Sequence, residues 1–134
     1  MMQGLATKPE LSPGKIRGLQ TLSTPGGLFK VLAIDHRDSL RVLLDPNDPD
    51  RLPAAELTAL KMAVIEQLAP EATAVMLEPE YSAAQAIVTG ALPGQVGFLA
   101  ALEAQGYLGD PYARQTTLLT GWSVAKAKRL GAGA

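Results

Sequence analysis

The residues best suited by type and spacing to carry chemistry lie at positions 34–38, where the chain reads Ile34-Asp35-His36-Arg37-Asp38. Asp35 could transfer protons or hold a substrate hydroxyl, and Arg37 could clamp a phosphate or carboxylate through two parallel hydrogen bonds. The structural alternative is that Asp35 or Asp38 caps the following helix and Arg37 pairs with one of them. We favour a functional role for Asp35, because the α/β folds that fit this chain place chemistry where a strand ends.

His36 is the only histidine, and the chain has no cysteine. Thiolate nucleophiles, disulfides and Cys-based zinc sites are therefore excluded within these residues, and one imidazole cannot form a His-rich metal cage. If strand geometry persists past Ile34, His36 and Asp35 face opposite sides, so only one of them reaches a common pocket. We retain His36 as a candidate substrate contact and predict neither a metal site nor a cofactor.

A second group of polar residues, Glu78, Glu80 and Tyr81, follows the apolar run 73–77. Adjacent parallel strands present their C-terminal ends side by side, so this group could line the same mouth as Asp35. Carboxylates grouped there could share acid and base work. For Glu80 and Tyr81 we favour a polar loop, and we keep Glu78 as a candidate substrate-binding residue.

The hydrophobic pattern predicts helices that alternate with strands, separated by clusters of proline, glycine and aspartate. The predicted helices span 8–23, 38–44, 50–69, 82–89 and 122–130, and the predicted strands span 28–34, 73–77 and 96–102. The first strand is so uniformly apolar that we expect it to be covered on both faces, as in a parallel sheet. This alternation is typical of βαβ units.

Two architectures fit this alternation equally well. An open doubly wound sheet can be complete near 134 residues, whereas a (β/α)8 barrel takes about 250 residues. The glycine-rich phosphate-binding signatures of open-sheet folds, G-x-G-x-x-G and G-x-x-x-x-G-K-[ST], are nevertheless missing. Three strands also leave two open sheet edges, whose unpaired backbone groups need a partner or a cover.

The composition is typical of one packed domain over residues 1–134. Hydrophobic residues make up 47% of the chain and charged residues 19%, which is enough for a core, and the length is too short for two ordinary domains. A net charge of −1 gives no field that would gather nucleic acid or an anionic membrane surface. The first residues lack the apolar run of a signal peptide, and no stretch approaches the roughly 20 apolar residues of a membrane span. We therefore expect a cytoplasmic protein that binds neither nucleic acid nor membrane.

Three blocks of sequence resemble the tagatose-1,6-bisphosphate aldolase family. They read Leu32-Ala33-Ile34-Asp35-His36-Arg37, then Met76-Leu77-Glu78-Pro79-Glu80-Tyr81, and finally Gly106-Tyr107-Leu108-Gly109-Asp110-Pro111 with Gly121-Trp122-Ser123-Val124, in the family's order. The resemblance spans about residues 15–132 and corresponds to roughly the first half of a family member. It implies an α/β fold, the N-terminal part of a (β/α)8 TIM barrel, with about three βα units preceded by a short helix.

The resemblance also implies a chemistry. Family members that form a Schiff base split a phosphorylated ketose into two three-carbon fragments without a metal. A lysine amine attacks the ketone, and the resulting iminium withdraws electrons from the bond that breaks. That lysine lies on a later strand, beyond the position of Ala134. Asp35 matches the family's first-strand aspartate, Arg37 lies beside it, and Glu78 falls where an acid commonly ends the second strand. His36 is a departure, because the family commonly has glutamine there.

The resemblance therefore predicts the N-terminal half of a class I sugar-phosphate aldolase, inactive as this chain alone. Its substrate would be a phosphorylated ketose once a complementing C-terminal half is supplied. Among the lysines, Lys30 lies inside the predicted first strand and is the hardest to dismiss, but it sits near the entry end of that strand. One alternative is a non-catalytic homo-oligomer in which two half-barrels pair to cover the open strands. Another is a small complete open-sheet domain that acts through Asp35 and Arg37.

Overall fold

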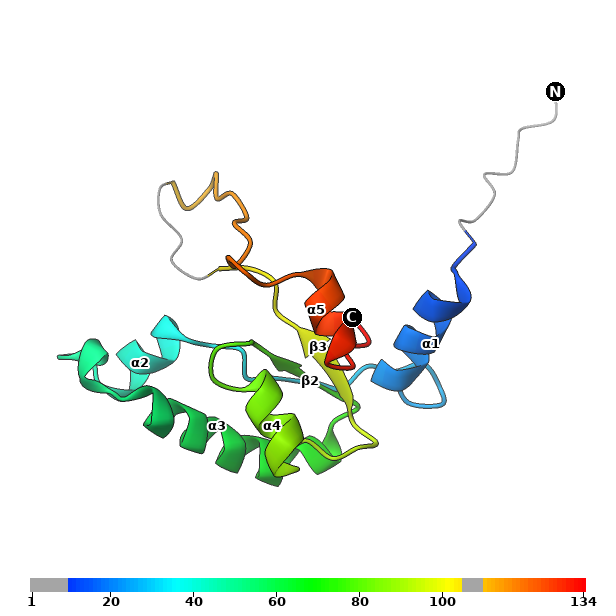
Figure 1. Cartoon of the computed structure of the whole chain (residues 1–134), viewed down its shortest axis with the longest axis horizontal. Coiled ribbons are helices and arrows are strands. Elements are labelled where there is room, and N and C mark those ends of the chain that lie inside the picture. The colour runs from blue at the N-terminus through cyan, green and yellow to red at the C-terminus, as the bar shows by residue number, and fades with distance from the viewer. Residues whose placement is uncertain (1–9, 105–109) are drawn as a thin grey trace.

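Strands and helices alternate along the chain in the computed structural model, which describes residues 10–104 and 110–134 (Figure 1). The strands are β1 (Val31–Ala33), β2 (Ala74–Leu77) and β3 (Gly97–Ala100). The helices are α1 (Pro13–Leu22), α2 (Asp38–Leu44), α3 (Ala54–Leu68), α4 (Ala83–Thr89) and α5 (Val124–Arg129), with 3-10 turns η1 (Pro49–Arg51) and η2 (Ala69–Glu71). Lys8, where the first helix was predicted to begin, lies outside the described residues.

The three strands form one parallel sheet in the order β1-β2-β3. Residues at the C-terminal end of the chain extend it beside β3. The Gly133 N–H donates to the Phe98 carbonyl oxygen, and the Ala100 N–H donates to the Ala134 carbonyl oxygen, both at 2.9 Å. Each successive segment along the chain thus pairs with the one before it, so the sheet grows at one edge, as expected of repeated βα units.

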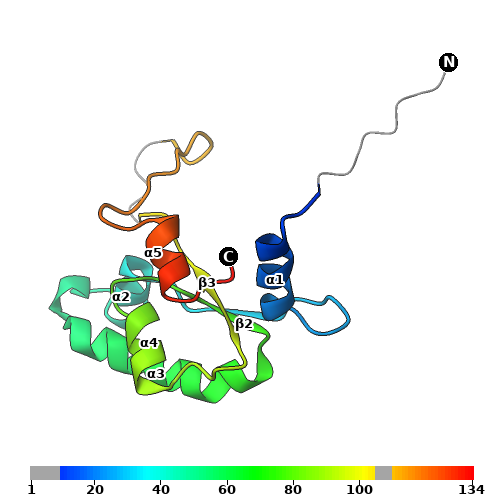
Figure 2. The ribbon, with the colours of Figure 1, turned by 45° about the vertical axis from the view of Figure 1, so that its right-hand side comes forward.

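The helices bury one face of this sheet. Leu32, Val75 and Phe98 lie side by side in the strand register and pack toward a core that includes Ile65 of α3 and Ala86 of α4. Figure 2 shows α4 and α5 on one side of β3 and α1 on the other. The sheet therefore has a helix-covered face, and α1 lies on the other side of β3.

Helix α1 reaches the N-terminal end of the sheet by direct backbone contact. A Cβ atom on Gly97, the first residue of β3, would overlap the carbonyl oxygen of Thr21 and lie 2.8 Å from the Leu22 side chain. A Cβ atom on Gly18 of α1 would lie 2.5 Å from the carbonyl oxygen of Gly133. Glycine at these positions lets helix and sheet approach closely enough to close this end.

Strand β1 is shorter and less covered than the sequence predicts. The structure reduces the predicted strand 28–34 to Val31–Ala33, because the Leu28 N–H donates to the Thr24 hydroxyl at 3.0 Å and closes a turn. The first residue of β1 remains 42% exposed. The prediction of a strand covered on both faces is therefore wrong for β1, whereas in β2 only Met76 is partly exposed.

The other predicted elements are confirmed, the helix at 38–44 with the predicted bounds and the rest with tighter bounds. The helix predicted at 50–69 begins at Ala54, because Pro53 takes the cap position and the residues before it form η1. The strand predicted at 96–102 spans Gly97–Ala100. Within residues 10–104 and 110–134, each helix is too short or too polar to traverse a bilayer.

Candidate active site

A pocket of about 240 Å³ opens where the three strands end. Its wall combines Asp35 and Arg37, which follow β1, with Met76 of β2 and residues 100–104 at the end of β3. The carboxyl ends of parallel strands meet at one edge of a sheet, and α/β folds place their sites there. The structure therefore brings two of the predicted site residues, Asp35 and Arg37, to one pocket.

Asp35 and His36 lie in different environments. Asp35 is half-buried and lines the pocket, whereas His36 is exposed and lies outside its wall. Within the described ranges, the Asp35 carboxylate forms no hydrogen bond or ion pair. The N-cap position of α2 belongs to Arg37, whose side chain makes no capping bond, so the capping alternative does not describe Asp35.

Arg37 joins the loops that follow all three strands. Its Nη1 forms an ion pair with Glu80 Oε2 at 3.4 Å, and its Nη2 donates to the Glu103 carbonyl oxygen at 2.6 Å. The Arg37 side chain is almost fully buried, whereas the Glu80 side chain is 42% exposed, so the guanidinium is shielded from water while its ion pair with Glu80 remains partly open to it. Because the planar guanidinium bonds to two acceptors from different loops, its position in this wall of the pocket is fixed.

Glu78 follows β2 directly, as predicted, but it is fully buried and does not line the pocket. Its Oε1 accepts from Lys61 Nζ at 2.6 Å and from the Ser82 hydroxyl at 2.7 Å. Its Oε2 accepts from the backbone N–H groups of Glu80 at 2.7 Å and Tyr81 at 2.9 Å. From this position Glu78 shapes the loop between β2 and α4.

Lys61 is the member of this cluster that the sequence reasoning missed. It lies on α3 between Leu57 and Ile65 at a spacing of four residues, and all three are buried. A charged residue inside a buried helical stripe is the signal that could have identified it, because a buried ammonium requires a partner. That partner is the carboxylate at the end of β2, Glu78.

Tyr81 lies close to two cations. The guanidinium carbon of Arg41 is 5.7 Å from the centre of the ring, and Lys61 Nζ is 5.8 Å from it. Arg41 Nη2 also lies 3.5 Å from the Tyr81 hydroxyl. The loop predicted for Glu80 and Tyr81 is confirmed, and these contacts anchor it to α2 and α3.

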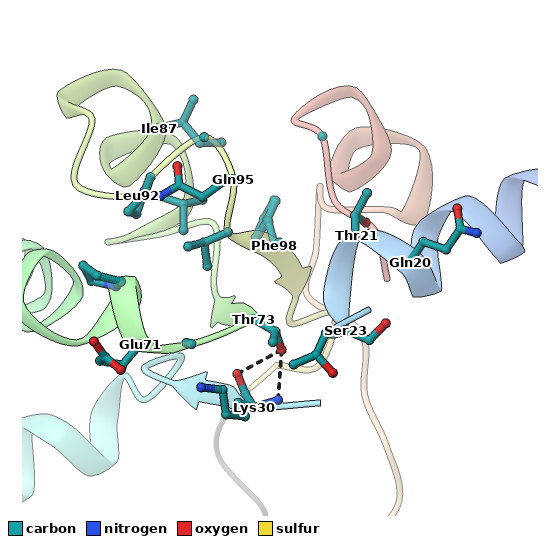
Figure 3. Close-up of a pocket in the computed structure, with 18 of the residues that line it drawn as sticks. Gln20, Thr21, Ser23, Lys30, Glu71, Thr73, Ile87, Leu92, Gln95 and Phe98 are labelled. Atoms are coloured by element: carbon teal, nitrogen blue, oxygen red, sulfur yellow. Dashed lines mark hydrogen bonds between the residues drawn. The ribbon is translucent and has the colours of Figure 1, made fainter. Parts of the chain in front are cut away.

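A larger cavity of about 1010 Å³ lies at the opposite, N-terminal end of the strands (Figure 3). Thr21 of α1, Lys30, Thr73 and Phe98 are among its lining residues. The Thr73 hydroxyl accepts from the Lys30 N–H at 2.9 Å and donates to the Lys30 carbonyl oxygen at 3.2 Å, which ties the entries of β1 and β2 together. In parallel α/β folds this end serves stability, so the smaller pocket at Asp35 is the candidate active site.

The remaining polar and aromatic candidates have structural roles. The Trp122 indole N–H donates to the Ala101 carbonyl oxygen at 3.0 Å, and its side chain packs against the core. Three exposed cations form the last turn of α5: Lys126, Lys128 and Arg129. The sequence block that begins at Gly106 falls largely on residues 105–109, outside the described residues.

Comparison with known proteins gives the family. Residues 29–134 match the DeoC/LacD family aldolase. The chain is 36% identical over 126 residues to the tagatose 1,6-diphosphate aldolase 2 of Enterococcus faecalis, and 33% identical over 126 residues to that of Streptococcus mutans. Each alignment covers 92% of this chain but 36% and 37% of the relatives, so the chain spans about a third of the length of these curated relatives.

These matches confirm the resemblance carried by the three sequence blocks. The family's fold is the (β/α)8 barrel, and the parallel strands with their helices form the N-terminal part of such a barrel. The chain belongs to the DeoC/LacD aldolase family.

Proposed function

We propose that the pocket at Asp35 is part of the active site of a class I sugar-phosphate aldolase. In this proposal Asp35 orients a substrate hydroxyl or relays a proton, while His36 at the rim and Arg37 in the wall contact the phosphorylated ketose. Glu78 supports the site from behind by holding the loop after β2. The observation that carries the proposal is that Asp35 lines a pocket at the C-terminal end of β1, in a chain 36% identical to a tagatose 1,6-diphosphate aldolase.

We infer that the Schiff-base amine comes from βα units other than those described here, either in a longer chain or in a complementing polypeptide. None of the described residues that line the pocket is a lysine. Lys61 is buried against Glu78, Lys30 lies at the N-terminal end of the sheet, and Lys126 is on the exposed side of α5. An amine must reach the ketone carbon, and these three positions do not reach this pocket.

The chemistry that this arrangement would serve is reversible carbon–carbon cleavage. A lysine amine adds to the ketone, and loss of water gives an iminium. The electron pair of the breaking C–C bond moves into the iminium to form an enamine, while the hydroxyl of the departing fragment loses its proton and becomes an aldehyde. Protonation and hydrolysis of the enamine release the second fragment. Asp35 is placed to receive or return a hydroxyl proton at such a site.

Binding can be tested on this chain directly. Titration of the ¹⁵N-labelled protein with tagatose 1,6-diphosphate should shift the backbone signals of residues 35–37 and 100–104. Asp35→Asn should weaken the response, whereas Asp50→Asn, at an exposed position in η1, should not. Shifts confined to other parts of the chain, or equal affinity in both variants, would contradict the assignment of the pocket.

The origin of the amine is tested by borohydride trapping. The chain alone, incubated with tagatose 1,6-diphosphate and sodium borohydride, should show no sugar adduct by mass spectrometry, while an active class I aldolase in a parallel sample does. A reduced adduct mapped to a lysine of this chain would overturn the inference that the amine lies elsewhere.

A second candidate function, an assembly module in which two copies of the chain pair, is favoured by one observation. Apolar side chains are exposed next to the open edge of β1: Leu28 is 69% exposed, Phe29 55% and Val31 42%. An open edge with apolar side chains is a pairing surface. Light scattering should then give a dimer for the wild type and for Val88→Glu on α4, but a monomer for Phe29→Glu. A monomeric wild type at all concentrations would remove this candidate.

A further inference from the structure

A fully buried ion pair joins α3 to the end of β2, outside the pocket. Lys61 Nζ donates to Glu78 Oε1 at 2.6 Å, and both side chains are 0% exposed. Desolvation of two charges can cancel their attraction, so a buried pair is weak evidence for stability. Its stronger effect is geometric when the other atoms of the carboxylate bond to specific groups.

Glu78 makes those further bonds to the loop between β2 and α4. Its Oε2 accepts the backbone N–H groups of Glu80 and Tyr81, two and three residues ahead. The Ser82 hydroxyl donates to Glu78 Oε1 at 2.7 Å and lies 3.2 Å from the Glu78 backbone nitrogen, whose N–H it accepts. A carboxylate that accepts N–H groups just ahead of it defines the turn, so the loop depends on the orientation in which Lys61 holds Glu78.

The loop in turn carries Glu80 to Arg37. The Glu80 carboxylate pairs with Arg37 at 3.4 Å, and Arg37 lines the pocket together with Asp35. Three contacts therefore lead from α3 to the pocket wall: Lys61 to Glu78, Glu78 to the backbone of Glu80, and Glu80 to Arg37.

We propose that Lys61 is a positioning residue for the pocket at Asp35. Lys61 does not line the pocket. It acts through Glu78, which fixes the loop that presents Glu80 to Arg37. The proposal rests on the proposed function for the identity of the ligand, a phosphorylated ketose. The geometry of the loop and of Arg37 is measurable without any ligand.

The test compares Lys61→Met with the wild type by ¹H–¹⁵N NMR. The signals are the backbone amides of Glu80 and Tyr81 and the side-chain Nε–Hε group of Arg37. Lys61→Met should remain folded, shift these signals, and raise the dissociation constant for tagatose 1,6-diphosphate about tenfold, because a displaced contact group weakens a positioned site. Lys15→Met, on an exposed position of α1, is the matched control and should match the wild type. Unchanged loop and Arg37 signals in Lys61→Met would overturn the proposal.

The double variant Lys61→Met with Glu78→Gln separates positioning from packing. The neutral amide that Glu78→Gln introduces can accept from the loop N–H groups and donate to the Ser82 hydroxyl without a buried countercharge. The double variant should therefore return the Glu80, Tyr81 and Arg37 signals toward those of the wild type. If Lys61 only fills space in the core, the double variant should move these signals further from those of the wild type, because the second substitution removes another native contact. If Lys61→Met does not fold, the double variant decides alone, and its failure to fold would also overturn the proposal.

Failure of the proposed function gives a different result. If the wild type shows no response to tagatose 1,6-diphosphate, the assignment of the ligand fails. The ligand-free signals of Glu80, Tyr81 and Arg37 still measure whether Lys61 positions the loop. The two outcomes therefore remain separate.

Discussion

Arg37 Nη2 donates to the carbonyl oxygen of Glu103, 66 residues later in the chain, at 2.6 Å. The same guanidinium pairs with Glu80, so one side chain spans the loops after β1, β2 and β3. Strand β1 has only three residues, which form few ladder bonds of their own. The C-terminal ends of the three strands are therefore held together by the contacts of the Arg37 side chain as well as by backbone pairing.

Replacement of Arg37 by lysine should lower the free energy of unfolding by about 1–3 kcal/mol, because one ammonium cannot reach both Glu80 and the Glu103 carbonyl and leaves a partly buried acceptor without its donor. Urea unfolding followed by the fluorescence of Trp122, the only tryptophan, measures the loss. Arg51→Lys is the control, since Arg51 pairs with Asp45 but its side chain is 75% exposed. That control should change stability by about 0.5 kcal/mol or less. Equal losses in both variants would contradict the role given to Arg37.

Gly97→Ala should disturb the contact between α1 and β3. Its new methyl group would overlap the carbonyl oxygen of Thr21, which belongs to a helix backbone and cannot rotate away. We expect a loss of about 1–3 kcal/mol, typical of an overpacked contact. Gly94→Ala adds the same methyl group at a position with no heavy atom within 4 Å, so it should leave the free energy of unfolding unchanged. Similar denaturation midpoints for the two variants would show that α1 does not pack as described.

Helix α3 offers two leucines in opposite environments. Leu57 is 1% exposed and Leu68 is 51% exposed. Leu57→Ala should cost about 2–5 kcal/mol, because it leaves a cavity in a close-packed region, whereas Leu68→Ala should cost less than about 1 kcal/mol. Differential scanning calorimetry of both variants compares the two losses within one helix. A larger loss for Leu68 would reverse the assignment of the buried face.

The alternation of helices and strands could be predicted because each element carries its own local period. The period that indicated α3 came from Leu57, Leu60, Val64, Ile65 and Leu68. The structure instead buries Leu57, Lys61 and Ile65 most deeply on that helix. Local spacing therefore located the helix but not its most deeply buried face. That face includes Lys61, which is buried because it pairs with Glu78, 17 residues later in the chain and just after β2.

The site was predictable only in the part that follows β1 directly. The position of Asp35 at the pocket could be predicted because a strand end fixes where the next side chain lies. The ties that hold Arg37 join residues 43 and 66 positions apart, and no local pattern encodes such contacts. The solvent exposure of β1 could not be predicted for the same reason. Burial of the second face of a strand depends on distant segments that pack against it, and the local sequence does not encode them.

Asp35→Ala distinguishes a ligand contact from a helix cap. The variant should keep the free energy of unfolding within about 0.5 kcal/mol of the wild type, because the Asp35 carboxylate has no partner in the described part of the chain and Arg37 holds the N-cap position of α2. Ser123→Ala removes a real cap, the hydroxyl that accepts the Lys126 N–H at 3.2 Å, and should cost about 1 kcal/mol.

Both variants would then be titrated with tagatose 1,6-diphosphate while the NMR signals of residues 100–104 are followed. Asp35→Ala should lose the response at unchanged stability, whereas Ser123→Ala should keep the response at reduced stability. We expect this opposite pattern because Asp35 lines the pocket, whereas the Ser123 hydroxyl bonds to the backbone of α5. A destabilised Asp35→Ala with an intact ligand response would assign Asp35 to the fold and leave the pocket without its acid.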